Sequence, residues 1–258
     1  MSVPVLLLHS GGMSSRQFGR LAAALQQDGR VVHAPDLLGH GDAPDLLGDG
    51  PFDLEVELRR LEDLVDGLRA EAGVPAVDLV GHSYGGLVAL HLVRRRPDTV
   101  RRLALFEPVA FGVLRDPPDE EGLASLAVVA EDSIFRDPDP DDLEPWLRVF
   151  VDFWSGPGAW DALGDAGRAS FLHAGRTLVG GIAAVVDDRT TVAALEAVGQ
   201  PTLLLSGGRS PLAARRVAAV LAAGLADARL HTIEDAGHMG PLTHAGEVND
   251  RVVAHLAA

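Results

Sequence analysis

Short runs of consecutive apolar residues alternate with longer segments of helical periodicity along most of this chain of 258 residues. Residues 76–81, "AVDLVG", form such a run, and the helix expected after it over residues 84–96 is ended by Pro97. Strands buried on both faces consist of continuous Val and Leu, and their alternation with helices predicts a parallel sheet covered by helices on both faces. We therefore expect an α/β fold with a mostly parallel sheet of about six strands. The expected strands are residues 3–9, 30–36, 76–81, 100–108, 201–208 and 228–234.

Residues 112–186 break this alternation. The segment contains stretches rich in Pro and Asp, followed by helical pieces that hold all three tryptophans of the chain. We expect a helical cap inserted into an α/β core that is formed by residues 1–111 and 187–258. The aromatic side chains of this cap either hold it together or line a substrate pocket. The candidates for the pocket are Trp146, Phe150 and Trp154.

The composition argues against several classes of function. A net charge of −15 disfavours nucleic acid and anionic membranes as partners, because both require basic patches. The chain has no cysteine, which excludes disulfides and thiolate chemistry and agrees with a cytoplasmic location. No signal peptide is visible, and no apolar run approaches the roughly 20 residues of a membrane-spanning helix. The histidines lack metal-ligand spacing, so we predict no metal, no cofactor, and a small-molecule substrate for a monomer or homodimer.

The strongest chemical signal is the segment Gly81-His82-Ser83-Tyr84-Gly85, which fits the pattern G-x-S-x-G between a predicted strand and a predicted helix. A serine in that position is held on a tight turn that needs small residues on both sides. The turn exposes the hydroxyl above the sheet, and the positive end of the following helix favours an attacking oxyanion. We therefore expect Ser83 to be a nucleophile.

Two further segments supply the chemistry that such a nucleophile needs. The first expected strand runs into "HSGG", residues 9–12, whose glycines let a backbone N–H face an oxyanion. We assign one donor to Gly11, with Gly12 as the alternative, and the other donor to Tyr84. His238 follows the last expected strand in "DAGHMG", residues 235–240, where a neutral imidazole can accept the serine proton.

These motifs, together with "DLLGHG" at residues 36–41, resemble those of the α/β-hydrolase fold family, and the resemblance runs over nearly the whole chain. It implies a serine hydrolase with a helical cap and a chain order of serine, acid, histidine. The two strands that open the sheet in this family have no counterpart before residues 3–9. We therefore expect the trimmed sheet of about six strands described above.

The acid departs from the usual family pattern. In most such hydrolases it follows the strand that corresponds to residues 201–208, but here that turn reads "GGRSP" and Ser210 occupies the place. Glu107 closes the preceding strand, and some family members carry their acid there. We predict Glu107 as the acid that orients the histidine and stabilises its charged form. Asp187, Asp188 and Asp235 remain alternatives.

The predicted function is hydrolysis of a small or medium, largely apolar ester through an acyl-enzyme on Ser83. Two alternatives stay open. Hydrolysis of a carbon–carbon bond or of a lactone would use the same three residues. A non-catalytic protein that binds a small ligand under the cap is favoured by the serine at position 210, where the family usually has its acid.

Overall fold

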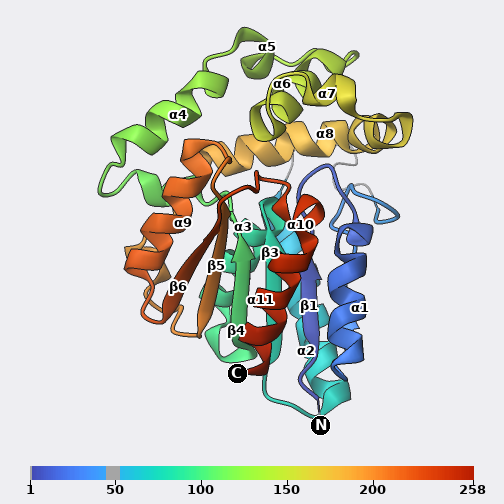
Figure 1. The fold of residues 1–258 in the computed structure, drawn as a ribbon, viewed down its shortest axis with the longest axis vertical. Helices are drawn as coiled ribbons and strands as arrows, with labels where there is room; N and C mark the ends of the chain where they lie inside the picture. The colour runs from blue at the N-terminus through green and yellow to red at the C-terminus, as the bar shows by residue number, and fades with distance from the viewer. Residues whose placement is uncertain (1, 45–52) are drawn as a thin grey trace.

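The computed structural model describes residues 2–44 and 53–258, and it forms a single parallel sheet with helices on both faces (Figure 1). The strand order is β2-β1-β3-β4-β5-β6, and every neighbouring pair is parallel. This confirms the predicted α/β fold with six strands. The strands are β1 Val5–Leu8, β2 Val32–His33, β3 Val77–His82, β4 Val100–Phe106, β5 Thr202–Gly207 and β6 Ala228–Ile233.

Helices cover both faces of the sheet and explain why its central strands are continuously apolar. The helices α1 Gly19–Gln27 and α11 Ala245–Ala257 pack on one face, in front of the sheet in Figure 1. On the other face lie α2 Leu54–Ala72, α3 Tyr84–Arg95 and α9 Leu212–Gly224. Successive side chains of a strand point to opposite faces of the sheet. Leu7 of β1 therefore packs on the side of α1 and α11, whereas Leu6 and Leu8 pack on the side of α2, α3 and α9.

Local signals set the ends of these helices. The side chain of Asp53 accepts a hydrogen bond from the backbone N–H of Glu55 at 2.9 Å and caps α2. The same helix ends at Gly73, whose φ of +64° lies in the left-handed region that favours glycine. Helix α3 ends at Arg95, one residue before its predicted end, and thus stops before Pro97 as expected.

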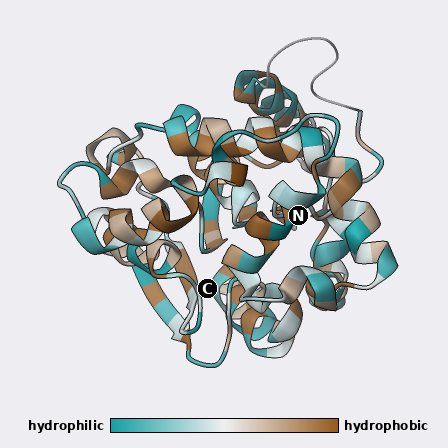
Figure 2. Cartoon of the chain, turned by 90° about the horizontal axis from the view of Figure 1, so that it is seen from above, coloured by the Kyte–Doolittle hydropathy of each residue, from teal (hydrophilic) through white to brown (hydrophobic). Residues whose placement is uncertain are grey.

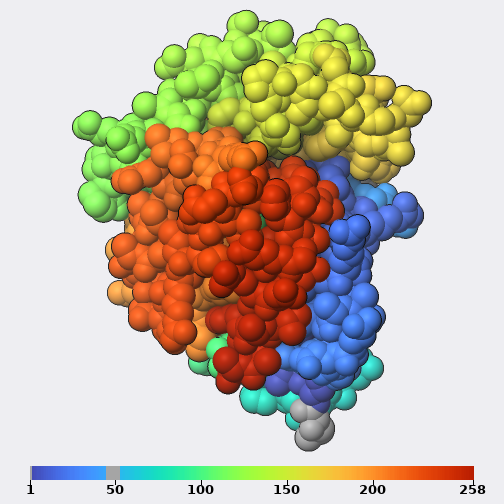
Figure 3. Space-filling model, viewed as in Figure 1, coloured from blue at the N-terminus to red at the C-terminus, as the bar shows by residue number. Residues whose placement is uncertain are grey.

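Five helices lie between β4 and β5 in the chain and above the carboxyl edge of the sheet (Figures 1 and 3). The 3-10 helix Phe111–Leu114 leads into them from β4. Seen from above, hydrophilic residues mark the periphery and hydrophobic ones gather inside (Figure 2). The division into a core and a cap of residues 112–186 stays a prediction, and we call this segment the predicted cap. Its helices are α4 Glu120–Ala130, α5 Ser133–Arg136, α6 Glu144–Ser155, α7 Ala159–Ala162 and α8 Asp165–Asp187.

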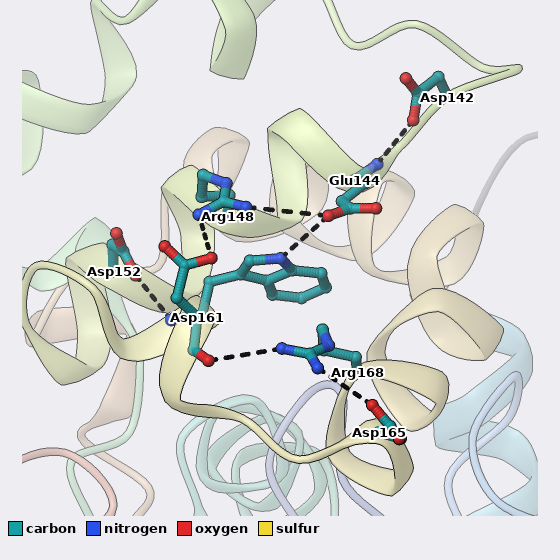
Figure 4. A network of polar contacts seen from close by, with 8 residues as sticks. Asp142, Glu144, Arg148, Asp152, Asp161, Asp165 and Arg168 are labelled. Carbon is teal, nitrogen blue, oxygen red and sulfur yellow. Dashed lines mark hydrogen bonds and ion pairs between the residues drawn. The ribbon is translucent and has the colours of Figure 1, made fainter.

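Ion pairs and aromatic packing hold the helices of the predicted cap together. On its surface Arg148 pairs with Asp161 at 2.6 Å, and the indole N–H of Trp160 donates to Glu144 at 3.3 Å (Figure 4). Exposed ion pairs of this kind contribute about 0–1 kcal/mol each. The indole ring of Trp160 is itself buried, so apolar burial contributes more to holding this part together.

Helix α8 is longer and more apolar than the sequence analysis anticipated. Among the described residues it is the one helix whose length and composition alone would allow it to cross a membrane. Helices that pack against a protein core pass the same test. One side of α8 packs onto the molecule through Phe171, Leu178 and Val185, which are all buried. About a third of its apolar window, 33%, is buried in this way.

Candidate active site

Ser83 lies at the turn between β3 and α3, in a backbone conformation with φ +54° and ψ −119°. The glycines beside it are required by close backbone contacts. A Cβ atom at Gly81 would lie 2.7 Å from the carbonyl oxygen of Gly85, and a Cβ at Gly85 would collide with the carbonyl oxygen of Leu8. Within the described residues, Ser83 and Glu107 are the two non-glycine residues with positive φ. Backbone strain of this kind concentrates at functional sites.

Three predicted residues from distant parts of the chain meet at the carboxyl edge of the sheet. The Nε2 atom of His238 lies 2.9 Å from the hydroxyl oxygen of Ser83, and its Nδ1 atom lies 2.7 Å from a carboxylate oxygen of Glu107. All three side chains are buried. The carboxylate can only accept from Nδ1–H, so Nε2 is left as the acceptor for the serine hydroxyl. This arrangement can take a proton from Ser83.

The carboxylate of Glu107 is held by the neighbouring strand. Glu107 follows β4 with φ +44° and its side chain has no solvent exposure. The oxygen that does not face His238 accepts hydrogen bonds from the hydroxyl of Ser206 and the backbone N–H of Gly207, both at 2.8 Å. These donors at the end of β5 favour the charged carboxylate in a buried position. Sequence reasoning missed Ser206, although a polar residue closing the apolar run "LLLS" was a signal for it.

The alternative acids lie elsewhere in the described structure. Asp235 forms an exposed ion pair with Arg209. Asp188 contacts His91, at 3.6 Å, and the hydroxyl of Thr190. Asp187 is exposed at the end of α8. The imidazole of the serine–histidine pair is thus bonded to Glu107, while Asp235 and Asp188 have other partners and Asp187 is exposed.

One pocket joins the predicted oxyanion donors to the serine. Gly11, Ser83 and Tyr84 line it from the core, and Phe150 and Trp154 line it from α6. Tyr84 is the first residue of α3, so its N–H belongs to the end of the helix that favours negative charge. The other lining residues are His40, Val109, Phe111, Thr177, Leu178, Gly181, Ile182 and Val185.

Comparison with known proteins identifies the family. The sequence profile of the alpha/beta hydrolase family matches residues 5–251. The chain belongs to the alpha/beta hydrolase family. This confirms the resemblance drawn from the motifs and the prediction that the chain is a hydrolase. The match agrees with the fold and with the serine turn described above.

Individual relatives of this alpha/beta hydrolase include esterases. It is 32% identical over 245 residues to the pimeloyl-(acyl-carrier protein) methyl ester esterase of Neisseria meningitidis strain MC58, covering 93% of this chain and 88% of the relative. It is 26% identical over 266 residues to a 2-hydroxymuconate semialdehyde hydrolase of Pseudomonas sp. strain CF600, covering 98% and 87%. A solved hydrolase from Pseudomonas aeruginosa shares the fold, with TM-score 0.75 and 21% identity over 100% of this chain and 91% of that one.

Trp154 of the hydrolase contacts the histidine as well as the pocket. Its indole stacks on the imidazole of His238, with ring centroids 4.0 Å apart and an interplanar angle of 27°. Trp146, the third predicted pocket residue, does not line the pocket. It stacks between Phe135 and Phe150, and its indole N–H donates to the carbonyl oxygen of Phe135 at 3.1 Å. Trp146 therefore packs within the predicted cap.

Several other histidines of the hydrolase are buried around the site and uncharged. Burial, assisted by the neighbouring His40, lowers the pKa of His9 to about 4. Burial also lowers the pKa of His40, and it lowers that of His82 well below the usual value, with His238 as the next cause. At neutral pH these three rings therefore add no positive charge to the site. In the described residues no group of three or more His, Cys, Asp or Glu side chains is arranged to hold a metal ion.

Proposed function

We propose that this hydrolase cleaves small or medium, largely apolar esters through an acyl-enzyme on Ser83. The observation that carries the proposal is the continuous hydrogen-bonded chain from Ser83 through His238 to Glu107. It contains a nucleophile, a base and an acid in the order that activates a serine hydroxyl. The esterase names of the relatives support the same type of bond.

The reaction follows from the positions of these groups. The Ser83 oxygen attacks the acyl carbon while Nε2 of His238 takes its proton, and Glu107 stabilises the imidazolium that forms. The N–H groups of Gly11 and Tyr84 hold the oxyanion of the tetrahedral intermediate. The imidazolium then returns the proton to the leaving alcohol. Water, deprotonated by the same imidazole, releases the acid and restores the serine.

The pocket supports the choice of substrate. Its walls are mainly aliphatic and aromatic side chains, which favour an uncharged, apolar acyl group. The space left inside it is about 30 Å³, so an acyl chain of several carbons enters only when the wall residues shift. We infer that residues 112–186 act as a cap that opens for substrate. We also infer a cytoplasmic enzyme that acts as a monomer or homodimer.

A second candidate is hydrolysis of a carbon–carbon bond, favoured by the relative named a 2-hydroxymuconate semialdehyde hydrolase. The same serine and histidine serve both reactions. The non-catalytic alternative was motivated by the serine at the usual place of the acid. A carboxylate from β4 within 2.7 Å of the imidazole removes that motive.

Substitution of the acid tests the proposal. Glu107→Gln keeps the shape of the side chain but removes its charge, and we expect turnover of p-nitrophenyl esters to fall by about 10³–10⁴-fold. Asp235→Asn is the matched control, because this exposed carboxylate pairs with Arg209, whereas the imidazole pairs with Glu107. A fluorophosphonate probe should label Ser83 and fail to label Ser83→Ala. Wild-type turnover in Glu107→Gln, or an unlabelled but folded wild type, contradicts the assignment.

A further inference from the structure

We propose that Gln17 and His82 form a positioning relay, which ties the backbone of His238 to the oxyanion turn and keeps His82 in one uncharged tautomer. The proposal rests on the function proposed above. Neither residue touches the reacting atoms. Gln17 lies on the 3-10 helix Ser15–Phe18 and His82 ends β3, directly before the nucleophile.

The relay is a continuous series of buried hydrogen bonds. The backbone N–H and the hydroxyl of Ser10 donate to Oε1 of Gln17 at 3.1 and 2.8 Å. Nε2 of Gln17 lies 2.9 Å from Nδ1 of His82, and Nε2 of His82 lies 2.9 Å from the carbonyl oxygen of His238. All four side chains are buried. The series therefore starts beside Gly11, a predicted oxyanion donor, and ends on the residue that carries the base.

The partners at the two ends fix the direction of every bond. A backbone N–H at Ser10 must donate, so the amide oxygen of Gln17 faces it and the amide NH₂ faces His82. Nδ1 of His82 is then an acceptor. At the other end the carbonyl oxygen of His238 can only accept, so Nε2 of His82 carries the hydrogen. One neutral tautomer of His82 satisfies the whole series.

The charge of His82 matters because its ring centroid lies 4.9 Å from that of His238. A proton on His82 would repel the imidazolium that forms when Ser83 attacks. His9 is the other titratable group that would act on His82 if it were charged, and the ring of Phe106 packs edge-on against the His82 ring at 5.5 Å. With Gln17 donating to Nδ1, His82 has no free position for a second proton. The relay therefore keeps a positive charge away from the base.

The same series of hydrogen bonds also fixes the distance between the oxyanion turn and the backbone of His238. Ser10 directly precedes Gly11, and the far end of the relay holds the backbone of His238. A shift of about 1 Å between catalytic groups costs up to about 100-fold in rate. Loss of the relay should therefore lower kcat, whereas KM should change little because neither Gln17 nor His82 lines the substrate pocket.

Replacement of Gln17 by Met tests the relay, because Met has a similar length and cannot make these hydrogen bonds. We expect kcat for a p-nitrophenyl ester to fall between about 10- and 100-fold with KM nearly unchanged. Gln26→Met, at an exposed position of α1, is the matched control. His82→Leu should show a similar loss, and the double variant should lose no more than either single one. His82→Gln, which can accept and donate at the two ends, should recover most of the rate.

The tautomer and protonation state of His82 can be measured directly, and they would not change if Gln17 had only a structural role. In the wild type, ¹⁵N spectra of the histidine rings should contain one histidine, absent in His82→Gln, that carries its hydrogen on Nε2 and does not titrate between pH 5 and 8. In Gln17→Met the carbonyl oxygen of His238 still holds the hydrogen on Nε2, but Nδ1 has lost its donor, so this residue should begin to titrate. A wild-type His82 protonated on Nδ1 overturns the proposal without any variant. The proposal is also overturned if Gln17→Met folds and has the same kcat as the control variant Gln26→Met. In either case wild-type esterase activity and Ser83 labelling remain, so the proposed function is judged separately.

Discussion

The stacking of Trp154 on the base leads to a quantitative prediction. The indole face lies 4.0 Å from the imidazole of His238, and the two side chains are only 8% and 3% exposed. When His238 takes the serine proton it becomes a cation, and an aromatic face attracts a cation. For a desolvated pair this attraction is about 1–2 kcal/mol. Since it acts on the imidazolium and not on the neutral ring, it lowers the barrier and corresponds to about 5- to 30-fold in rate.

Replacement of Trp154 by Leu removes the aromatic face but still covers the imidazole with apolar atoms. We expect kcat for p-nitrophenyl acetate to fall by about 5- to 30-fold, and replacement by Phe should lie between the wild type and Leu. Steady-state kinetics at a fixed neutral pH measure the effect.

Phe150→Leu is the control for changes in the pocket. Phe150 lines the same pocket from the same helix, and its ring packs edge-on against Trp154 at 6.4 Å. This variant should change KM for longer acyl chains and lower kcat for p-nitrophenyl acetate less than Trp154→Leu does. Equal kcat values for Trp154→Leu and Phe150→Leu would show that stacking on the imidazole contributes nothing to the rate.

Three further variants test the surroundings of the site. Ser206→Ala removes a charge-assisted hydrogen bond to Glu107 worth about 1.5–3 kcal/mol, so urea unfolding should show a loss of about this size, while kcat should fall less because Glu107 is charged both before and after the proton transfer. Gly85→Ala forces a Cβ against the carbonyl oxygen of Leu8, and urea unfolding should show a loss of at least about 1–3 kcal/mol. His9 has a pKa of about 4 when folded and 6.5 when unfolded, so the unfolded chain binds the proton more readily between these values. The stability associated with neutral His9 is complete above pH 6.5 and falls by about 3 kcal/mol toward pH 4, and urea titrations should show a flatter dependence in His9→Gln.

Local patterns in the sequence predicted the strands and the serine turn, because their causes are local. Gly81 and Gly85 are required by atoms within a few residues or on the adjacent strand. The edge strand was predicted less well. Residues 30–36 gave an expected strand of full length, whereas β2 pairs with β1 only over Val32–His33. An edge strand has one neighbour, so its length depends on that neighbour and not on its own apolar content.

Contacts between side chains of distant segments could not be predicted in the same way. The imidazole of His238 meets Trp154 from α6, and its carbonyl oxygen meets His82 from β3. Nothing in the periodicity of either segment encodes these pairs. The prediction that Trp146 lines the pocket shows the same limit, because aromatic spacing on α6 does not tell which side faces the serine. Only the packing of the predicted cap on the core decides this.

The strand that carries the acid is weakly constrained by the fold itself. The carboxyl ends of parallel strands share one edge, so a carboxylate after β4 or after β5 can reach the same imidazole. In this chain the proposed acid, Glu107, directly follows β4, and β5 contributes hydrogen-bond donors to it through Ser206 and Gly207. The turn after β5 therefore does not need to carry the charged group, and the hydroxyl of Ser210 in this turn has no hydrogen-bond partner among the described residues. A missing acid at the usual position is therefore evidence for inactivity only after the neighbouring strand end has been checked for a buried carboxylate with donors beside it.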